Sequence, residues 1–181
     1  MQWALGIIKA KAKANKFEKV RDASILDFSG ISRLEDFLKA SYQFMRGERA
    51  IAVLFDGDEA GVKSSRALMN YMANKEIPFR ANEEFVLLSN GMPIEGLFPH
   101  QWIIDLYSEF PKWFPVLLTD MSGKLISFKI DDDSKKSVQA RLMKRAEEET
   151  IAKAHYAWAA SFIALFGLLE KMLETREKAV L

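Results

Sequence analysis

One segment constrains the fold of this chain more than any other: an apolar run that is followed at once by an acidic turn and then by a helical pattern. The apolar run covers Ala50 to Phe55, and Asp56 and Asp58 lie in the turn directly after it. An uninterrupted apolar run is typical of a buried strand in a parallel sheet. Ligands of open α/β sheets bind at the carboxyl ends of such strands. We therefore expect a parallel α/β sheet with two carboxylates at its edge.

The segments on either side of this run alternate between helical and extended patterns. The sequence predicts a helix over residues 2–14, a strand over 24–28, a helix from Ile31 to near Gly47, a helix from Ala60 that ends before Pro78, and a strand over 84–88. Strands that alternate with helices indicate a parallel sheet with right-handed crossovers and helices on its faces.

The second half of the chain has a different pattern. Residues 94–98 predict a turn that leads into a short helix at about 99–109, and residues 113–119 predict a strand or an extended edge segment. One or two long helices are expected from Ser134 to Thr175, with any interruption near Thr150. We therefore expect an α/β domain over residues 1–130, with its first strand missing. Residues 131–181 are expected to form a C-terminal helical extension that packs on this domain or dimerises.

The acidic turn has two interpretations that use only its own residues. Gly57 and Gly61 predict a close backbone approach or unusual dihedral angles, as a turn facing a metal or a phosphate requires. In the other interpretation an aspartate of the turn caps the following helix. An EF-hand loop beginning at Asp56 is excluded, because its fifth position would be Ala60 and its twelfth, which must be a bidentate acid, would be Ala67.

Composition excludes several classes of site. The chain has no cysteine, which rules out disulfides and thiolate metal sites, and its two histidines argue against a histidine-rich zinc site. A net charge of +1 gives no overall attraction for nucleic acid, so DNA binding would depend on local basic groups such as the one over residues 135–145. The uncharged segment 156–169 is too short to span a bilayer comfortably. We predict a cytoplasmic protein that does not associate with membranes.

Three segments together resemble a known family. Residues 55–61, Phe-Asp-Gly-Asp-Glu-Ala-Gly, resemble the Asp-x-Asp motif of the Toprim domain, which topoisomerases, primases and certain nucleases share. Residues 94–99, Ile-Glu-Gly-Leu-Phe-Pro, resemble the segment after the fourth strand of the Toprim domain in OLD-family (overcoming lysogenization defect) ATP-dependent endonucleases. Residues 136–140 are similar to that family's Lys-x-x-x-Ala helix start. The resemblance covers roughly residues 2 to 170.

This resemblance implies metal-dependent hydrolysis of DNA phosphodiester bonds with two Mg²⁺ or Mn²⁺ ions. It assigns Asp56, Asp58 and Glu95 to metal binding, and Lys136 to charge stabilisation at the scissile phosphate. All four would be catalytic residues. Glu95 could instead cap a helix, and Lys135 could serve in place of Lys136.

The chain departs from the family pattern at its start. In the family the first Toprim strand ends in a Glu-Gly motif whose glutamate is catalytic, and residues 2–5 resemble the helix that follows that motif. We therefore expect a fragment or remnant that begins after the catalytic glutamate and lacks the N-terminal ATPase. Such a chain would be impaired alone and would need an upstream segment or a partner polypeptide for full activity.

Two other functions stay open. A haloacid-dehalogenase-like phosphatase also has Asp-x-Asp after a strand, with Asp56 as the nucleophile and the acids at 131–133 as distant metal ligands, but Ala60 stands where that family usually has Thr or Val. A non-catalytic module is the second alternative. It depends on an apolar stripe that would either mediate a homodimer or docking, or pack inside the molecule. The stripe consists of Trp158, Phe162, Leu165, Phe166, Leu169 and Met172.

Overall fold

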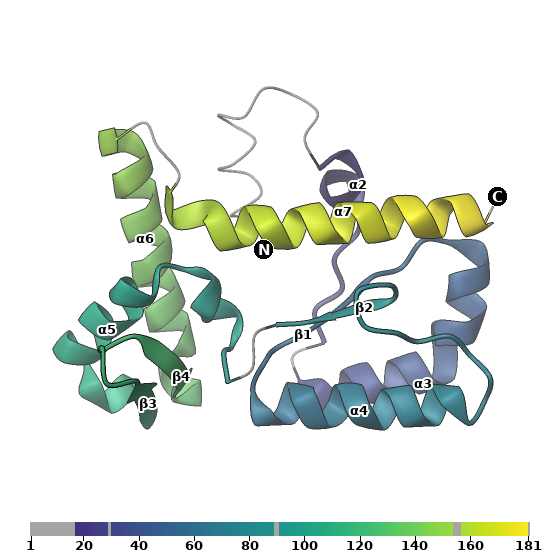
Figure 1. The fold of residues 1–181 in the computed structure, drawn as a ribbon, viewed down its shortest axis with the longest axis horizontal. Helices are drawn as coiled ribbons and strands as arrows, with labels where there is room; N and C mark the ends of the chain where they lie inside the picture. The colour runs from purple at the N-terminus through teal and green to yellow at the C-terminus, as the bar shows by residue number, and fades with distance from the viewer. Residues whose placement is uncertain (1–16, 29, 89–90, 154–156, 181) are drawn as a thin grey trace. The chain divides into compact units, whose positions relative to one another are not determined.

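The computed structural model describes residues 17–28, 30–88, 91–153 and 157–180, and it has a mixed α/β fold (Figure 1). The α-helices are α2 (Glu18–Asp22), α3 (Ile31–Glu48), α4 (Glu59–Ala73), α5 (His100–Glu109), α6 (Lys135–Lys153) and α7 (Ala160–Val180). The strands are β1 (Val53–Phe55), β2 (Phe85–Leu87), β3 (Val116–Thr119) and β4 (Leu125–Lys129). Short 3-10 helices cover Ile94–Leu97, Pro111–Trp113, Asp132–Ser134 and Ala157–Ala159. The helix predicted over residues 2–14 lies outside the described residues.

The described residues form two compact units. We call residues 17–88 and 165–180 the parallel unit, and residues 91–153 and 157–164 the hairpin unit. This division differs from the expected one, because a boundary at residue 130 falls inside the hairpin unit.

The parallel unit is built around β1, α4 and β2. The two strands pair in parallel, with Val53 opposite Phe85 and Phe55 opposite Leu87. Side chains of α3 and α4 bury the strands in one apolar core, and Figure 1 shows these two helices side by side. The core consists of Leu38, Tyr42, Val53, Phe55, Leu68, Met72, Ile77, Phe79 and Phe85. The predicted order of helix, strand, helix and strand over residues 31–88 is therefore confirmed, although both strands are shorter than expected.

The strand predicted over residues 24–28 is wrong, since this segment has no regular secondary structure. Ile25 and Leu26 are exposed, and Phe28 packs beside Phe37 of α3 with ring centroids 4.7 Å apart. A strand needs a neighbour with which to exchange backbone hydrogen bonds, and apolar residues alone do not supply one. The parallel sheet of the described residues consequently has two strands.

The hairpin unit contains the antiparallel pair β3 and β4, in which Leu117 lies opposite Phe128. The strand expected within 113–119 is confirmed as β3, and the short helix expected at 99–109 is confirmed as α5. Sequence reasoning missed β4. The turn before β4 contains Gly123, whose φ of 82° lies in the left-handed region that favours glycine.

The C-terminal apolar stripe contributes buried residues to each unit, Trp158 and Phe162 to the hairpin unit and the other four to the parallel unit. All six of its residues are buried. Trp158 and Phe162 contact the ring of Phe98, and Phe166 contacts the ring of Phe17. This burial agrees with the interpretation of the stripe as intramolecular packing, and homodimerisation stays an untested prediction. Within the described ranges, none of the helices has both the length and the apolar character needed to cross a bilayer.

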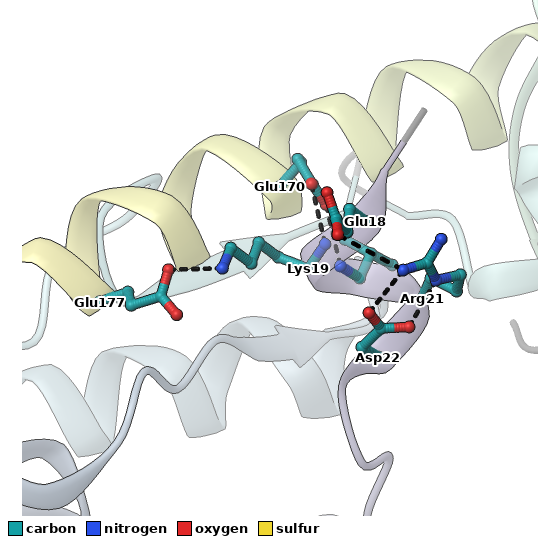
Figure 2. A network of polar contacts seen from close by, with 7 residues as sticks. Glu18, Lys19, Arg21, Asp22, Glu170 and Glu177 are labelled. Atoms are coloured by element: carbon teal, nitrogen blue, oxygen red, sulfur yellow. Dashed lines mark hydrogen bonds and ion pairs between the residues drawn. The ribbon is translucent and has the colours of Figure 1, made fainter. Parts of the chain in front are cut away.

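The short helix α2 is held by side chains of α7 (Figure 2). The carboxylate of Glu170 accepts hydrogen bonds from the backbone N–H groups of Lys19 and Val20, both at 2.9 Å. The ammonium of Lys19 also pairs with Glu177 at 2.6 Å. The residue before α2, Phe17, supplies no side-chain cap and has a left-handed backbone with φ 63°. Glu170 thus caps α2 from about 150 positions away in the sequence.

Candidate functional site

The acidic turn, residues 56–58, joins the carboxyl end of β1 to the first residue of α4. Asp56 is exposed and Asp58 is half-buried. Both carboxylates therefore follow a strand of a parallel pair, as the sequence predicts. This is the position at which ligands of open α/β sheets bind.

Asp58 is the N-cap residue of α4. Its Oδ1 accepts a hydrogen bond from the backbone N–H of Gly61 at 2.8 Å, and its backbone is extended, with φ −71° and ψ 173°. The carbonyl of Asp58 accepts the first helical hydrogen bond, from Val62 N–H, at 3.0 Å. The capping interpretation is therefore confirmed for Asp58. Capping does not exclude metal binding, because an ionised carboxylate offers about four lone-pair sites and this cap occupies one of them.

Gly61 is required by a close contact between the first turn of α4 and the acidic turn. A Cβ atom at this position would lie 2.0 Å from the carbonyl oxygen of Asp56 and 2.9 Å from its carbonyl carbon. The predicted close backbone approach is confirmed here. The glycines with positive φ in the described chain are Gly30, Gly91 and Gly123, so the turn uses the small size of Gly61 and not an unusual dihedral angle.

The donor set of the acidic turn fits a hard divalent cation. Two carboxylates two residues apart supply oxygen ligands, which Mg²⁺ and Mn²⁺ prefer. Among the described residues, no three His, Cys, Asp or Glu side chains come together in a metal-binding group. Mg²⁺ is commonly held by only one or two carboxylates, together with water and substrate phosphate.

Glu95 lies in the 3-10 helix Ile94–Leu97 of the hairpin unit and is 4% exposed. Its Oε1 accepts a hydrogen bond from Nε2 of Gln139 on α6 at 2.7 Å. The N-cap positions of this 3-10 helix and of α5 are Pro93 and Pro99, and neither helix has a side-chain cap. Glu95 thus caps neither helix, contrary to the alternative that the sequence left open, and instead ties its segment to α6.

Lys135 and Lys136 begin α6, and both are exposed. Lys135 pairs with Asp132 at 3.0 Å, and this hydrogen bond lowers the pKa of the Asp132 carboxyl. Lys136 has no ion-pair partner in the part of the chain that the structure describes. It lies one helical turn before Gln139, the residue that donates to Glu95.

Three further basic residues of α6, Arg141, Lys144 and Arg145, are paired with acids. Arg141 lies 3.7 Å from Glu109, Lys144 lies 3.8 Å from Glu148, and Arg145 lies 2.7 Å from Asp105. The guanidinium groups of the two arginines also lie over aromatic rings, Arg141 over Phe110 and Arg145 over Trp102. Paired charges of this kind describe a solvated helix face and give no support for a continuous basic track.

The four predicted site residues belong to different units. Asp56 and Asp58 lie in the parallel unit, whereas Glu95 and Lys136 lie in the hairpin unit, so the structure describes each pair separately. Sequence reasoning missed Gln139 as the partner of Glu95. The two residues are 44 positions apart, and no local pattern links a glutamine on a helix surface to a buried glutamate.

Comparisons with known proteins identify no relative. No protein-family model, curated protein or solved structure matches this chain.

Proposed function

We propose that this chain carries a Toprim-type phosphodiesterase centre that depends on Mg²⁺ or Mn²⁺, of the kind found in OLD-family endonucleases, and that DNA is its substrate. The observation that carries the proposal is the acidic turn. An exposed aspartate and a half-buried one directly follow a strand of a parallel pair. The sequence of this turn has the Asp-x-Asp pattern of the Toprim motif.

Each residue has a defined part in this proposal. Asp56 and Asp58 hold the cation, and the Gly61 hydrogen bond fixes the orientation of the Asp58 carboxylate. A bound divalent ion would supply an activated water and neutralise charge at the scissile phosphate. In the hairpin unit, the resemblance assigns metal binding to Glu95, which accepts a hydrogen bond from Gln139, and charge stabilisation at a phosphate to Lys136.

Metal binding provides the most direct test. Titration of the purified chain with Mn²⁺, followed by electron paramagnetic resonance, should show a site that Asp56→Asn weakens by at least tenfold, because a carboxylate ligand is removed. Asp36→Asn is the matched control, since Asp36 is an exposed aspartate on α3 of the same unit. Its Mn²⁺ affinity should equal that of the wild type.

The variant Asp58→Asn separates the two roles of that residue. Asparagine caps helices as well as aspartate does but ligates Mn²⁺ poorly. The proposal expects this variant to fold normally and to lose Mn²⁺ affinity. A site that survives both Asp56→Asn and Asp58→Asn, or no site in the wild type, contradicts the proposal.

Activity distinguishes the nuclease from the phosphatase. Plasmid nicking in Mn²⁺ that Asp56→Asn abolishes and Asp36→Asn preserves would support phosphodiester hydrolysis. Turnover of a small phosphate ester with an aspartyl phosphate trapped at Asp56 would instead support the phosphatase alternative and overturn the nuclease assignment.

A further inference from the structure

We infer that the parallel unit binds a phosphate group between the guanidinium groups of Arg46 and Arg176. Arg46 lies in the last turn of α3, and Arg176 lies on α7. Both face the buried carboxylate of Glu84, which directly precedes β2. Because β1 and β2 are parallel, the amino end of β2 lies at the opposite edge of the pair from the acidic turn that follows β1. The phosphate site is therefore distinct from the proposed metal centre.

Glu84 does not satisfy the two arginines. Its Oε2 accepts a hydrogen bond from the backbone N–H of Arg80 at 2.9 Å. Its Oε1 lies 3.9 Å from Nη2 of Arg46 and 3.9 Å from Nη1 of Arg176. These distances are within the range of an ion pair but exceed the length of a hydrogen bond. The carboxylate therefore attracts both guanidinium groups without saturating the donors of either.

The cluster of Arg46, Arg176 and Glu84 has more positive than negative charge. Two guanidinium groups face one carboxylate, and the adjacent Tyr42 hydroxyl is neutral at pH 7, because burial raises its pKa to about 12. The Nε of Arg46 is buried and has no hydrogen-bond partner among the described residues. A buried donor without an acceptor is costly, and a buried charge without a counter-charge is more so. An anion between the two arginines would satisfy both needs.

The acids next to these residues in the sequence do not supply the missing negative charge. Each of them pairs with a different cation at the surface of the parallel unit. The pairs are Glu48 with Arg49, Glu83 with Arg80, and Glu177 with Lys19.

The two guanidinium groups match the oxygens of a phosphate. Each guanidinium presents its N–H donors as a planar fork that binds two oxygens at once. A carboxylate has only two oxygens, which one fork occupies, whereas a phosphate has further oxygens for the second fork. The side chains of Arg46 and Arg176 are 23% and 13% exposed, so an ion can reach them from solvent. Arg176 also donates from Nη2 to the carbonyl of Arg46 at 3.2 Å, which positions its side chain before a ligand binds.

Calorimetric titration with inorganic phosphate tests the site, in buffer freed of divalent metal and at constant ionic strength. Arg46→Gln and Arg176→Gln should each raise the dissociation constant at least tenfold, because each removes a charged fork. Arg49→Gln is the matched control, since Arg49 is an exposed arginine at the end of the same helix as Arg46. It should bind phosphate as the wild type does. No binding to the wild type, or an equal loss in the control, overturns the inference.

Glu84→Gln distinguishes a phosphate site from a cluster that only stabilises the fold. Glutamine keeps an oxygen for the N–H of Arg80 but removes the negative charge that competes with the ligand. The affinity for phosphate should therefore rise about threefold or more. A variant that folds badly would not show such a gain. Unchanged or weaker binding contradicts the inference.

The source of the phosphate group is identified by comparing ligands. A short oligonucleotide with a 5′-phosphate is titrated beside inorganic phosphate, and the same oligonucleotide without the phosphate is its control. Tighter binding of the phosphorylated oligonucleotide indicates the end of a nucleic acid as the ligand, whereas tighter binding of inorganic phosphate indicates the free ion. Acetate that binds as tightly as phosphate overturns the assignment of a phosphate.

Discussion

The starts of α2 and α4 are both capped by a carboxylate, but the two carboxylates come from very different places in the chain. α4 is capped by Asp58, which accepts a hydrogen bond from the backbone N–H of Gly61, three residues later in the sequence. α2 is capped by Glu170 of α7, which accepts from Lys19 and Val20 about 150 residues away. The backbone need is the same in both cases, because the first N–H groups of a helix have no partner within it.

The two caps therefore differ in what they require: the α4 cap forms within a local turn, whereas the α2 cap requires α7 to pack beside α2. The Asp58 cap forms whenever residues 56–61 adopt a strand-to-helix turn. The Glu170 cap exists only when α7 lies beside α2, as Figure 2 shows. A five-residue helix is too short to be stable alone, so α2 depends on that contact. Four predictions test this distinction, in order of decreasing effect.

The largest effect is expected at the local turn. Gly61→Ala would put a Cβ atom 2.0 Å from the Asp56 carbonyl oxygen, and a backbone atom cannot move away without distorting the turn. We expect a loss of about 3 kcal/mol in the free energy of unfolding, measured with urea. Gly47→Ala in α3 is the control, because its Cβ meets no atom within 4 Å. If the two substitutions have equal effects, the backbone near Asp56 moves away from the new Cβ atom at a small cost in free energy.

Removal of the distant cap should cost somewhat less. Glu170→Ala leaves the N–H groups of Lys19 and Val20 without their acceptor, so we expect a loss of about 2 kcal/mol and faster amide exchange in α2. Glu177→Ala removes only an exposed ion pair with Lys19 and should have a much smaller effect. If both substitutions have the same effect, the backbone cap is not what holds α2.

A pH titration tests a contact between distant segments, the buried environment of Tyr42 on α3, to which Arg176 of α7 contributes. Burial raises the pKa of Tyr42 to about 12, and the charge of Glu84 acts in the same direction against the nearby Arg46 and Arg176. The unfolded chain releases this proton near pH 10, so the contribution is complete below pH 10 and is lost as the pH rises toward 12.

Between pH 9 and pH 11, the wild type should therefore lose about 1.3 kcal/mol more stability than Tyr42→Phe. Denaturant unfolding of both proteins at each pH measures this difference, and subtraction removes the contribution of lysines. Parallel pH profiles for the two proteins would contradict the raised pKa.

The smallest effect is expected at the Asp58 cap. In metal-free buffer, Asp58→Ala should destabilise the chain by about 1 kcal/mol, whereas Asp58→Asn should cost only a few tenths, because asparagine also caps. Thermal unfolding in the presence of a chelator measures both. An Asp58→Asn variant as unstable as Asp58→Ala would mean that the negative charge, and not the hydrogen bond, stabilises α4.

The fold could be predicted from sequence wherever the pattern is local. The helices α3, α4 and α5 follow from apolar periodicity and from glycine and proline positions, whereas α6 continues through Thr150, where an interruption was expected. Ile25 and Leu26 misled the prediction, because a short apolar segment does not reveal whether a neighbouring strand exists. β4 was missed although Ile126, Phe128 and Ile130 alternate after Gly123, a pattern that favours a hairpin.

The sequence by itself determined strand β1, the acidic turn after it, the Asp58 cap and the need for glycine at position 61. These features arise among neighbouring residues, whose distances are set by the backbone. Tertiary structure alone decided that Glu170 caps α2 and that Gln139 binds Glu95. Such contacts join residues that are far apart in the chain. Their geometry is fixed only when the elements that carry them have packed together.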